Sequence, residues 1–106
     1  MNALLLFSKI FPEETRYAEY FRRQWEYVWQ YVIDHERGDW FEGGIDKEPQ
    51  FRTGQKSQMW KCTYHTGRAL MNCIDMMKGD PTRPINRLIA HWRNIALEIT
   101  SENSRL

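Results

Sequence analysis

What the sequence has little of already narrows the possibilities. It has only two cysteines, Cys62 and Cys73, which are too few for a disulfide framework, and nothing marks the chain for secretion. The apolar run at residues 3–7 is far shorter than the ~20 residues that a membrane-spanning helix needs. It also lacks the basic leader and cleavage site of a signal peptide. We therefore expect a cytoplasmic protein with free, largely buried thiols and no membrane partner.

An excess of charge of one sign is missing as well. The 15 basic and 14 acidic residues leave a formal net charge of +1, which creates no long-range field to attract a polyanion, so we expect no nucleic-acid partner. Cys62, His65 and Cys73 do not make up the four closely paired ligands of a structural zinc site. We accordingly expect no metal and no cofactor.

Aromatic rings, by contrast, are abundant. They make up 14% of the 106 residues, including five tryptophans and five tyrosines, in a chain long enough for one domain at most. The 42% hydrophobic content can supply a core. So much ring surface must be either buried or used for binding.

The pattern of apolar residues predicts an all-α protein of about four helices. We expect helices over residues 3–11, 13–33, 65–78 and 84–99, and a polar tail over residues 100–106 that frays. Pro12 followed by Glu13 and Glu14 is typical of a helix start, because proline needs no hydrogen-bond partner there and carboxylates favour the positive helix end. Gly79 is typical of a helix stop.

The second predicted helix has an unusually wide apolar surface. On a helical wheel its aromatic and aliphatic residues cover an arc of about 200°, against the ~100° stripe of a simple surface helix. The residues of this stripe are Tyr17, Tyr20, Phe21, Trp25, Tyr27, Val28, Trp29, Tyr31 and Val32. We expect this helix to pack against neighbours on more than one side, as a helix in a ring of helices does.

Residues 34–59 predict a long loop. Glycines and a proline interrupt any helix there, and apolar residues become sparse, although a short strand around Trp40 is compatible with the pattern. Loops of this length in a compact domain usually serve a function.

His65 is the first candidate for chemistry, since it falls at the start of the third predicted helix. The positive end of a helix disfavours imidazolium, so the ring would tend to stay neutral, as a general base that removes a proton from carbon must be. Position alone does not exclude a purely structural histidine, and indeed favours one. His35 and His91 have no supporting context, and His91 falls on the polar face of its helix.

Two sequence blocks resemble the C-terminal active-site segment of the N-acylglucosamine 2-epimerase and cellobiose 2-epimerase family. The first block reads DHERGDWFEGGID and includes Asp34, His35, Gly38, Trp40 and Phe41. The second reads WKCTYHTGR and includes Trp60, Lys61, Tyr64, His65 and Arg68. Their order and separation match the family together, and the likeness covers roughly residues 3–78. Beyond Gly79 the sequence resembles nothing in the family.

The resemblance implies a barrel of six helix hairpins, (α/α)6, with a sugar site in the mouth formed by loops at one end. Family members epimerise or isomerise at the carbon beside the open-chain carbonyl, where one histidine removes the C2 proton and a second returns one to the opposite face. His65 would be one of that pair, so its expected role is catalytic. Trp60 would stack on the sugar, which suits an indole physically. Its expected partner is thus a small carbohydrate.

Tyr64, Trp40 and Arg68 complete the expected substrate-binding set, and two of them have plain alternatives. A tryptophan in a glycine-flanked loop either lines a site or anchors the loop to the core. Arg68 lies one turn after His65 and could orient it or bind an anion, but a structural ion pair explains it as well.

The chain has too few predicted helices for a whole family barrel, so residues 1–106 read as one partial domain, with residues 34–59 as its active-site loop. We expect little or no epimerase activity from it alone, and a homo-oligomer that covers the barrel-facing aromatic surface. One alternative is a non-catalytic helical module that binds a sugar or a protein. Another is an unrelated helical bundle in which the rings only form a core.

Overall fold

A computed structural model describes residues 1–59 and 62–105, and it is all-α. Its helices are α1 (Asn2–Ile10), α2 (Arg16–Tyr31), α3 (Thr63–Lys78) and α4 (Pro84–Asn103), with a 3-10 turn η1 (Pro49–Arg52). The predicted helix content is therefore confirmed. In the described ranges, the strand considered around Trp40 reduces to a single antiparallel bridge with Ile33. No helix in these ranges is long and apolar enough to cross a bilayer.

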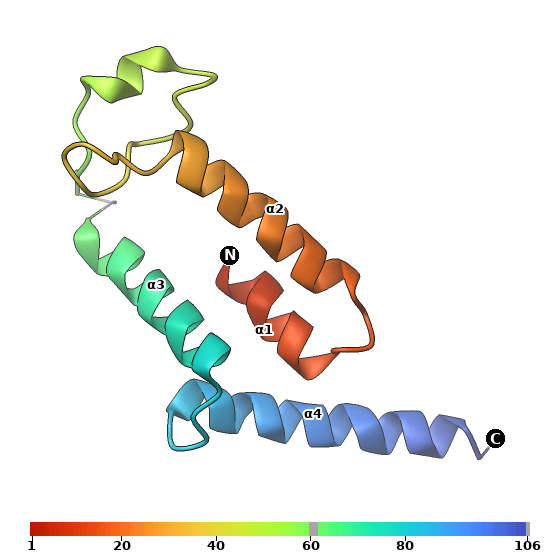
Figure 1. The fold of residues 1–106 in the computed structure, drawn as a ribbon. Helices are drawn as coiled ribbons and strands as arrows, with labels where there is room; N and C mark the ends of the chain where they lie inside the picture. Colours follow the sequence, from red (N-terminus) through yellow and green to blue (C-terminus); the bar gives the residue numbers. More distant parts are fainter. Residues whose placement is uncertain (60–61, 106) are drawn as a thin grey trace.

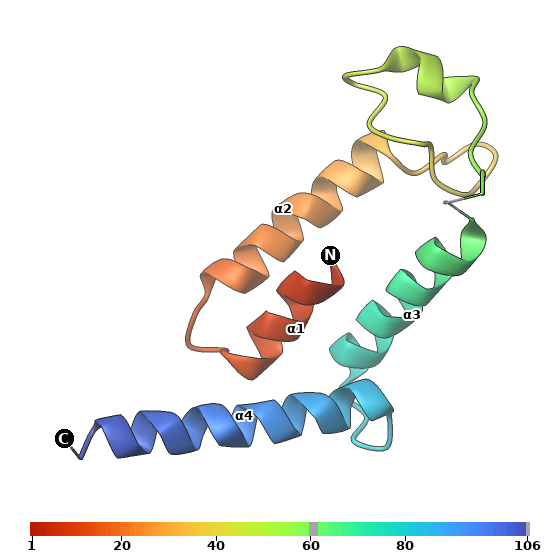
Figure 2. The ribbon, with the colours of Figure 1, turned by 180° about the vertical axis from the view of Figure 1, so that it is seen from behind.

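The short helix α1 is the centre of the arrangement. It lies between α2 and α3, while α4 runs across the ends of α1 and α3 (Figures 1 and 2). The backbone of α1 comes close to each of the other three helices, and α3 also comes close to α4. Within the described residues the backbone of α2 approaches neither α3 nor α4, although side chains of α2 and α3 line one apolar pocket. The radius of gyration is 17.4 Å, compared with about 13 Å for a compact chain of 100 residues. These four helices thus form an open fan, and the closed toroid that the resemblance implies is not formed by them.

The core is small and lies where α1 meets α3 and α4. Its buried centre consists of Leu5, Cys73 and Met76. Around them pack Met1, Leu6, Phe21, Ile85 and Ile89, which are only partly buried. Burial raises the pKa of the Cys73 thiol, which lies 3.1 Å from the Asn2 side-chain oxygen. Both cysteines are free, but Cys62 is exposed, contrary to the expected burial, because it precedes α3 outside this core.

The packing of α2 differs from the expectation. Among the described residues it packs mainly against α1 and the loop that follows it, and two rings of its wide aromatic stripe stay exposed. Tyr20 is 49% exposed and Trp29 is 54% exposed. The expected neighbours on further sides are not present in this fan of helices.

Two predicted helix ends are shifted. Helix α2 begins at Arg16, three residues after the expected start, because Glu13 and Glu14 lie in the turn after α1. Arg93 of α4 donates to the Glu13 carboxylate at 2.8 and 3.0 Å, which ties that turn to α4. Helix α4 continues through residue 103, so the expected fraying from residue 100 was wrong. Gly79 does end α3, with φ at 69°.

Candidate active site at the start of α3

The first turn of α3 carries the candidate residues Tyr64 and His65. Cys62 precedes the helix in an extended conformation, and its side chain makes no capping hydrogen bond. The His65 amide bonds to the Cys62 carbonyl at 3.1 Å, so His65 belongs to that first turn, as the sequence predicted. The helix dipole makes this a locally positive end.

The imidazole of His65 is open to solvent. Its ring meets the edge of the Tyr64 ring at a centroid distance of 5.4 Å and an angle of 68°. Tyr64 is itself 61% exposed. A general base must be reachable by the proton that it removes, and the exposed side chain of His65 meets this requirement.

Arg68 is brought to Tyr64. Its Nη1 donates to the Tyr64 hydroxyl at 3.1 Å, and its guanidinium lies 5.1 Å from the centre of the Tyr64 ring. Among the residues that the structure describes, Arg68 pairs with no carboxylate, so the structural ion pair considered for it is not found. The structure thus assembles Tyr64, His65 and Arg68 on one helix start.

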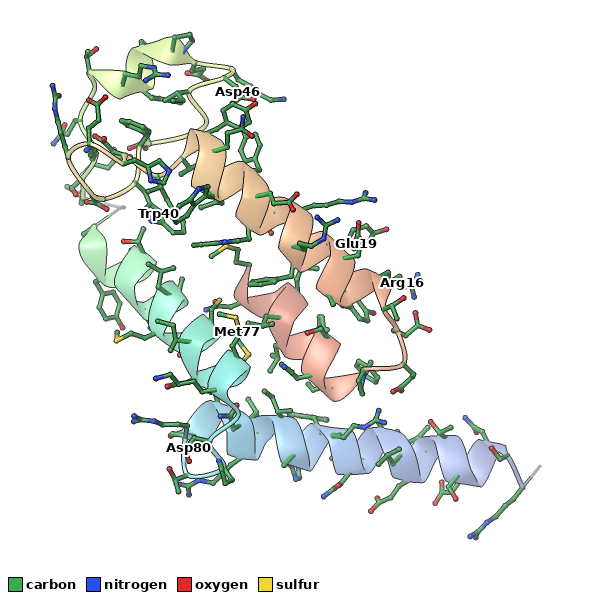
Figure 3. All side chains as sticks on the ribbon, viewed as in Figure 1. Arg16, Glu19, Trp40, Asp46, Met77 and Asp80 are labelled. Atoms are coloured by element: carbon green, nitrogen blue, oxygen red, sulfur yellow. The ribbon has the colours of Figure 1, made fainter. Side chains whose placement is uncertain are left out.

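Of the two tryptophans in the expected site, Trp40 is described by the structure and Trp60 lies outside the described residues. Trp40 is half-buried, and its backbone is held by the bridge to Ile33 and by a 2.8 Å bond from its amide to the Asp39 carboxylate. In the view of Figure 3, Trp40 lies between the C-terminal end of α2 and the N-terminal end of α3. Its place in the fold is compatible with both of its proposed roles, as pocket wall and as loop anchor.

Asp34 organises the first part of the loop. It is buried, and its Oδ1 accepts the amides of Glu36 and Arg37 at 3.0 Å each. Its Oδ2 accepts the Lys56 ammonium at 2.5 Å, and Lys56 also donates to the Gly38 carbonyl at 2.8 Å. The bond from Lys56 is the main reason that the pKa of Asp34 falls to about 2. Asp34 and Lys56 therefore join the two ends of the loop by a short ionic contact.

The middle of the loop is fastened to α2. The Tyr27 hydroxyl donates to Asp46 at 2.8 Å, a bond that raises the pKa of Tyr27. The Ile45 amide bonds to the carbonyl of Tyr31 at 3.0 Å. At Gly44 a Cβ atom would lie 1.9 Å from the Tyr27 hydroxyl oxygen, so only glycine fits this close approach.

One feature near the loop was missed at the sequence level. His35, for which no context was found, packs against Trp29 with ring centroids 4.6 Å apart, and its Nε2 lies 2.6 Å from the Trp29 carbonyl. Trp25, Glu26 and Gln30 join these two residues around an open groove of about 760 Å³. The sequence does contain a signal for this groove: Trp25 and Trp29 lie four residues apart on one helix face, and His35 follows shortly after the helix ends. His91 is exposed on α4, as predicted.

Within residues 1–59 and 62–105 no three histidine, cysteine or acidic side chains gather closely enough to hold a metal ion. The side chains at the start of α3 offer an imidazole beside a phenol that accepts from a guanidinium, which are groups suited to proton transfer, hydrogen bonding to hydroxyls and attraction of negative charge.

The chain is thus all-helical, with an exposed histidine in the first turn of α3 and, before that turn, a long loop held by polar contacts. These are the features to compare with known protein families. Residues 1–72 match the family model of N-acylglucosamine 2-epimerase (GlcNAc 2-epimerase). The chain belongs to this family of sugar epimerases, which confirms the resemblance drawn from its sequence. The match ends within α3 and leaves α4 outside. Neither the curated proteins nor the solved structures include a match to the chain.

Proposed function

We propose that His65 is an acid/base residue for epimerisation at C2 of an aldose. The observation that carries the proposal is the exposed imidazole of His65 in the first turn of α3, inside the segment that matches the epimerase family. The Tyr64 ring lies against it, and Arg68 donates to the Tyr64 hydroxyl. Tyr64 and Arg68 are the proposed contacts to sugar hydroxyls. Trp60 and Trp40 are the proposed walls of the sugar pocket.

The chemistry asks for a neutral imidazole close to a C–H bond that is acidified by the neighbouring carbonyl. The imidazole takes the C2 proton, the electron pair moves into an enediolate, and a proton returned to the other face gives the epimer. The positive end of α3 supports this because it attracts the negative charge of the developing enediolate. Arg68 adds a fixed positive charge one turn away.

Epimerisation needs a second acid/base group on the opposite face of the sugar. Among the described histidines, His35 is engaged with the carbonyl of Trp29, and His91 lies on α4 outside the family match. Neither is a natural partner of His65. We propose that the second group comes from another part of a family barrel, so that these 106 residues alone carry half of the catalytic pair.

The proposal that this chain supplies only one of the two acid/base groups can be tested directly. With one base, a proton that is removed from C2 can only return to the face it left. In D2O the chain should therefore exchange the C2 proton of N-acetylmannosamine, mannose or cellobiose for deuterium without forming the epimer, which proton NMR measures directly. His65→Gln should lower the exchange rate by about 10²–10⁴-fold, the usual contribution of a general base.

The matched control is His91→Gln, an exposed histidine outside the proposed site, which should leave the exchange rate unchanged. Saturation-transfer NMR with the same sugars reports binding separately. Binding without any exchange would favour the non-catalytic sugar-binding alternative. Exchange that is equal in the wild type and in His65→Gln would contradict the role given to His65.

A further inference from the structure

Helix α4 carries an apolar seam that is about half exposed among the residues that the structure describes. The seam consists of Leu88, Trp92, Ile95 and Ile99, which follow one another at intervals of four, three and four residues. Leu88 is 43% exposed, Trp92 is 48% exposed and Ile99 is 54% exposed. Because the family match ends at residue 72, neither the proposed sugar site nor the family likeness accounts for this surface.

The seam forms one wall of a groove whose other wall is α1. Leu6, Phe7, Ile10 and Phe11 line the α1 side, and the groove has a volume of about 540 Å³. The first part of α4 packs into the core through Ile85 and Ile89. The later part extends past α1 and ends free at the C-terminus, as both ribbon views show (Figures 1 and 2). The apolar surface continues along this projecting part.

The spacing of the seam is that of a coiled-coil interface and reads the same in both directions. A second α4 laid antiparallel along the first can therefore bring every seam residue opposite another. When Leu88 of one copy faces Ile99 of the second, Trp92 faces Ile95, and the same two contacts repeat across the two-fold axis. Isologous contacts of this kind build closed dimers.

Charges beside the seam favour the same pairing. At 100° per residue, Arg87, His91, Glu98 and Glu102 fall on one flank of the seam. Arg93 falls on the other flank, where it donates to the carbonyl of Ile10 in α1. In the antiparallel register Arg87 faces Glu102 of the second copy, and His91 faces Glu98 of the second copy. In a parallel pair this charged flank would instead face the other flank of the second copy, where Ile89, Ala96 and Asn103 carry no charge.

We propose that α4 is a homodimerisation helix, and that the occupant of the groove between α1 and α4 is the projecting end of α4 from a second copy of this chain. A helix of another protein would need the same spacing and the opposite charge order. The reversed copy of α4 already has both. The dimer would bury the exposed seam of each copy and place the two catalytic segments at its outer ends, where α3 begins.

The first test is sedimentation equilibrium of the whole chain with seam variants. The wild type should be a dimer at micromolar concentration. Ile99→Glu lies beyond the core and should weaken association by at least about tenfold, the effect of losing a buried interface anchor. Ser101→Glu adds the same charge on the opposite side of the helix and should leave the dimer intact. Circular dichroism checks that both variants keep their helices.

The second test reverses the edge charges. Arg87→Glu alone and Glu102→Arg alone each place like charges at both ends of the dimer, and each should weaken association by about three- to tenfold. A chain with both changes restores opposite charges and should dimerise like the wild type. Mixing the two single variants should give a heterodimer that is stronger than either homodimer.

A wild-type chain that stays monomeric at hundreds of micromolar would overturn the proposal. So would a dimer that survives Ile99→Glu, since association would then run through another surface such as the exposed stripe of α2. A dimer weakened by both single charge reversals but not rescued by the double change would overturn the antiparallel register.

Discussion

The two ends of the molecule are held together by different physics. At the end that carries the candidate active site, polar contacts staple the loop: Asp34 to Lys56, Tyr27 to Asp46 and Glu42 to Gln58. At the α4 end, apolar side chains meet around Met76, and the apolar seam of α4 stays partly exposed. Stability at the site end should therefore be sensitive to changes in charge and backbone conformation. Stability at the α4 end should be sensitive to changes in side-chain volume and to self-association.

The largest effect should come from the core. Met76 is 2% exposed and lies where α3 meets α1, so Met76→Ala removes volume from a cluster with few other members. We expect a loss of about 2–4 kcal/mol in the free energy of unfolding, measured by urea denaturation. Met71→Ala, at a position 61% exposed on the same helix, should change it by less than about 0.5 kcal/mol. Equal effects would mean that the small core does not hold these helices together.

A smaller and more local effect is expected at the loop. Gly44→Ala forces a methyl group into the hydroxyl of Tyr27 and should displace the loop from the end of α2 at a cost of about 1–3 kcal/mol. Gly54→Ala is the matched control, because its nearest contact would be an ordinary 3.5 Å. Amide hydrogen exchange should rise in residues 42–48 of the first variant, while α3 and α4 keep their protection. Global unfolding instead would contradict the separation of the two ends.

Acid should loosen the site end before the α4 end. The folded pKa of Asp34 is about 2, below its ordinary value of 3.8, so its ionised form stabilises the folded loop above about pH 4. That contribution is lost as the pH falls from about 4 to 2. Tryptophan fluorescence, with Trp40 as the loop reporter, should show a transition in this window. Asp34→Asn should remove the transition, whereas Asp80→Asn, in the turn before α4, should not.

The smallest expected effect is a gain in stability from a substitution inside α3. Gly67 lies within α3, and a Cβ there would meet nothing within 4 Å. Gly67→Ala should therefore stabilise the helix by about 0.5–1 kcal/mol, which a thermal melt can detect. The start of α3 should keep its geometry, so C2 exchange by His65 should be unchanged. A falling exchange rate would show that the glycine makes room for the sugar or for a neighbouring segment.

Features that depend on near neighbours in the chain could be predicted. The existence of the four helices, the stop at Gly79 and the location of His65 in a helix start all follow from spacing and capping within a few residues. Prediction was poorer where a distant residue intervened. The turn at Glu13 is tied to Arg93, which lies eighty positions later in the chain. Glu13 therefore belongs to this turn, and α2 starts at Arg16, later than predicted.

The candidate site shows the same division. Tyr64, His65 and Arg68 share one helical turn, so their proximity could be expected from their spacing. The spacing could not predict that Arg68 donates to the hydroxyl of Tyr64, because a carboxylate on another element could have accepted from the same guanidinium. The groove of Trp25, Trp29 and His35 was missed because it depends on how the chain turns after α2.

By itself the sequence determined the all-helical class, the family and the histidine at the start of α3, because helix periodicity and a motif of nine residues are local properties. Only the tertiary structure decided that Asp34 and Lys56 close the loop, that Tyr20 and Trp29 of α2 stay exposed, and that the seam of α4 is left about half exposed. These depend on which faces meet across long stretches of chain. Contacts of that kind are set by the competition of all apolar surfaces for a small core, which no single segment reveals.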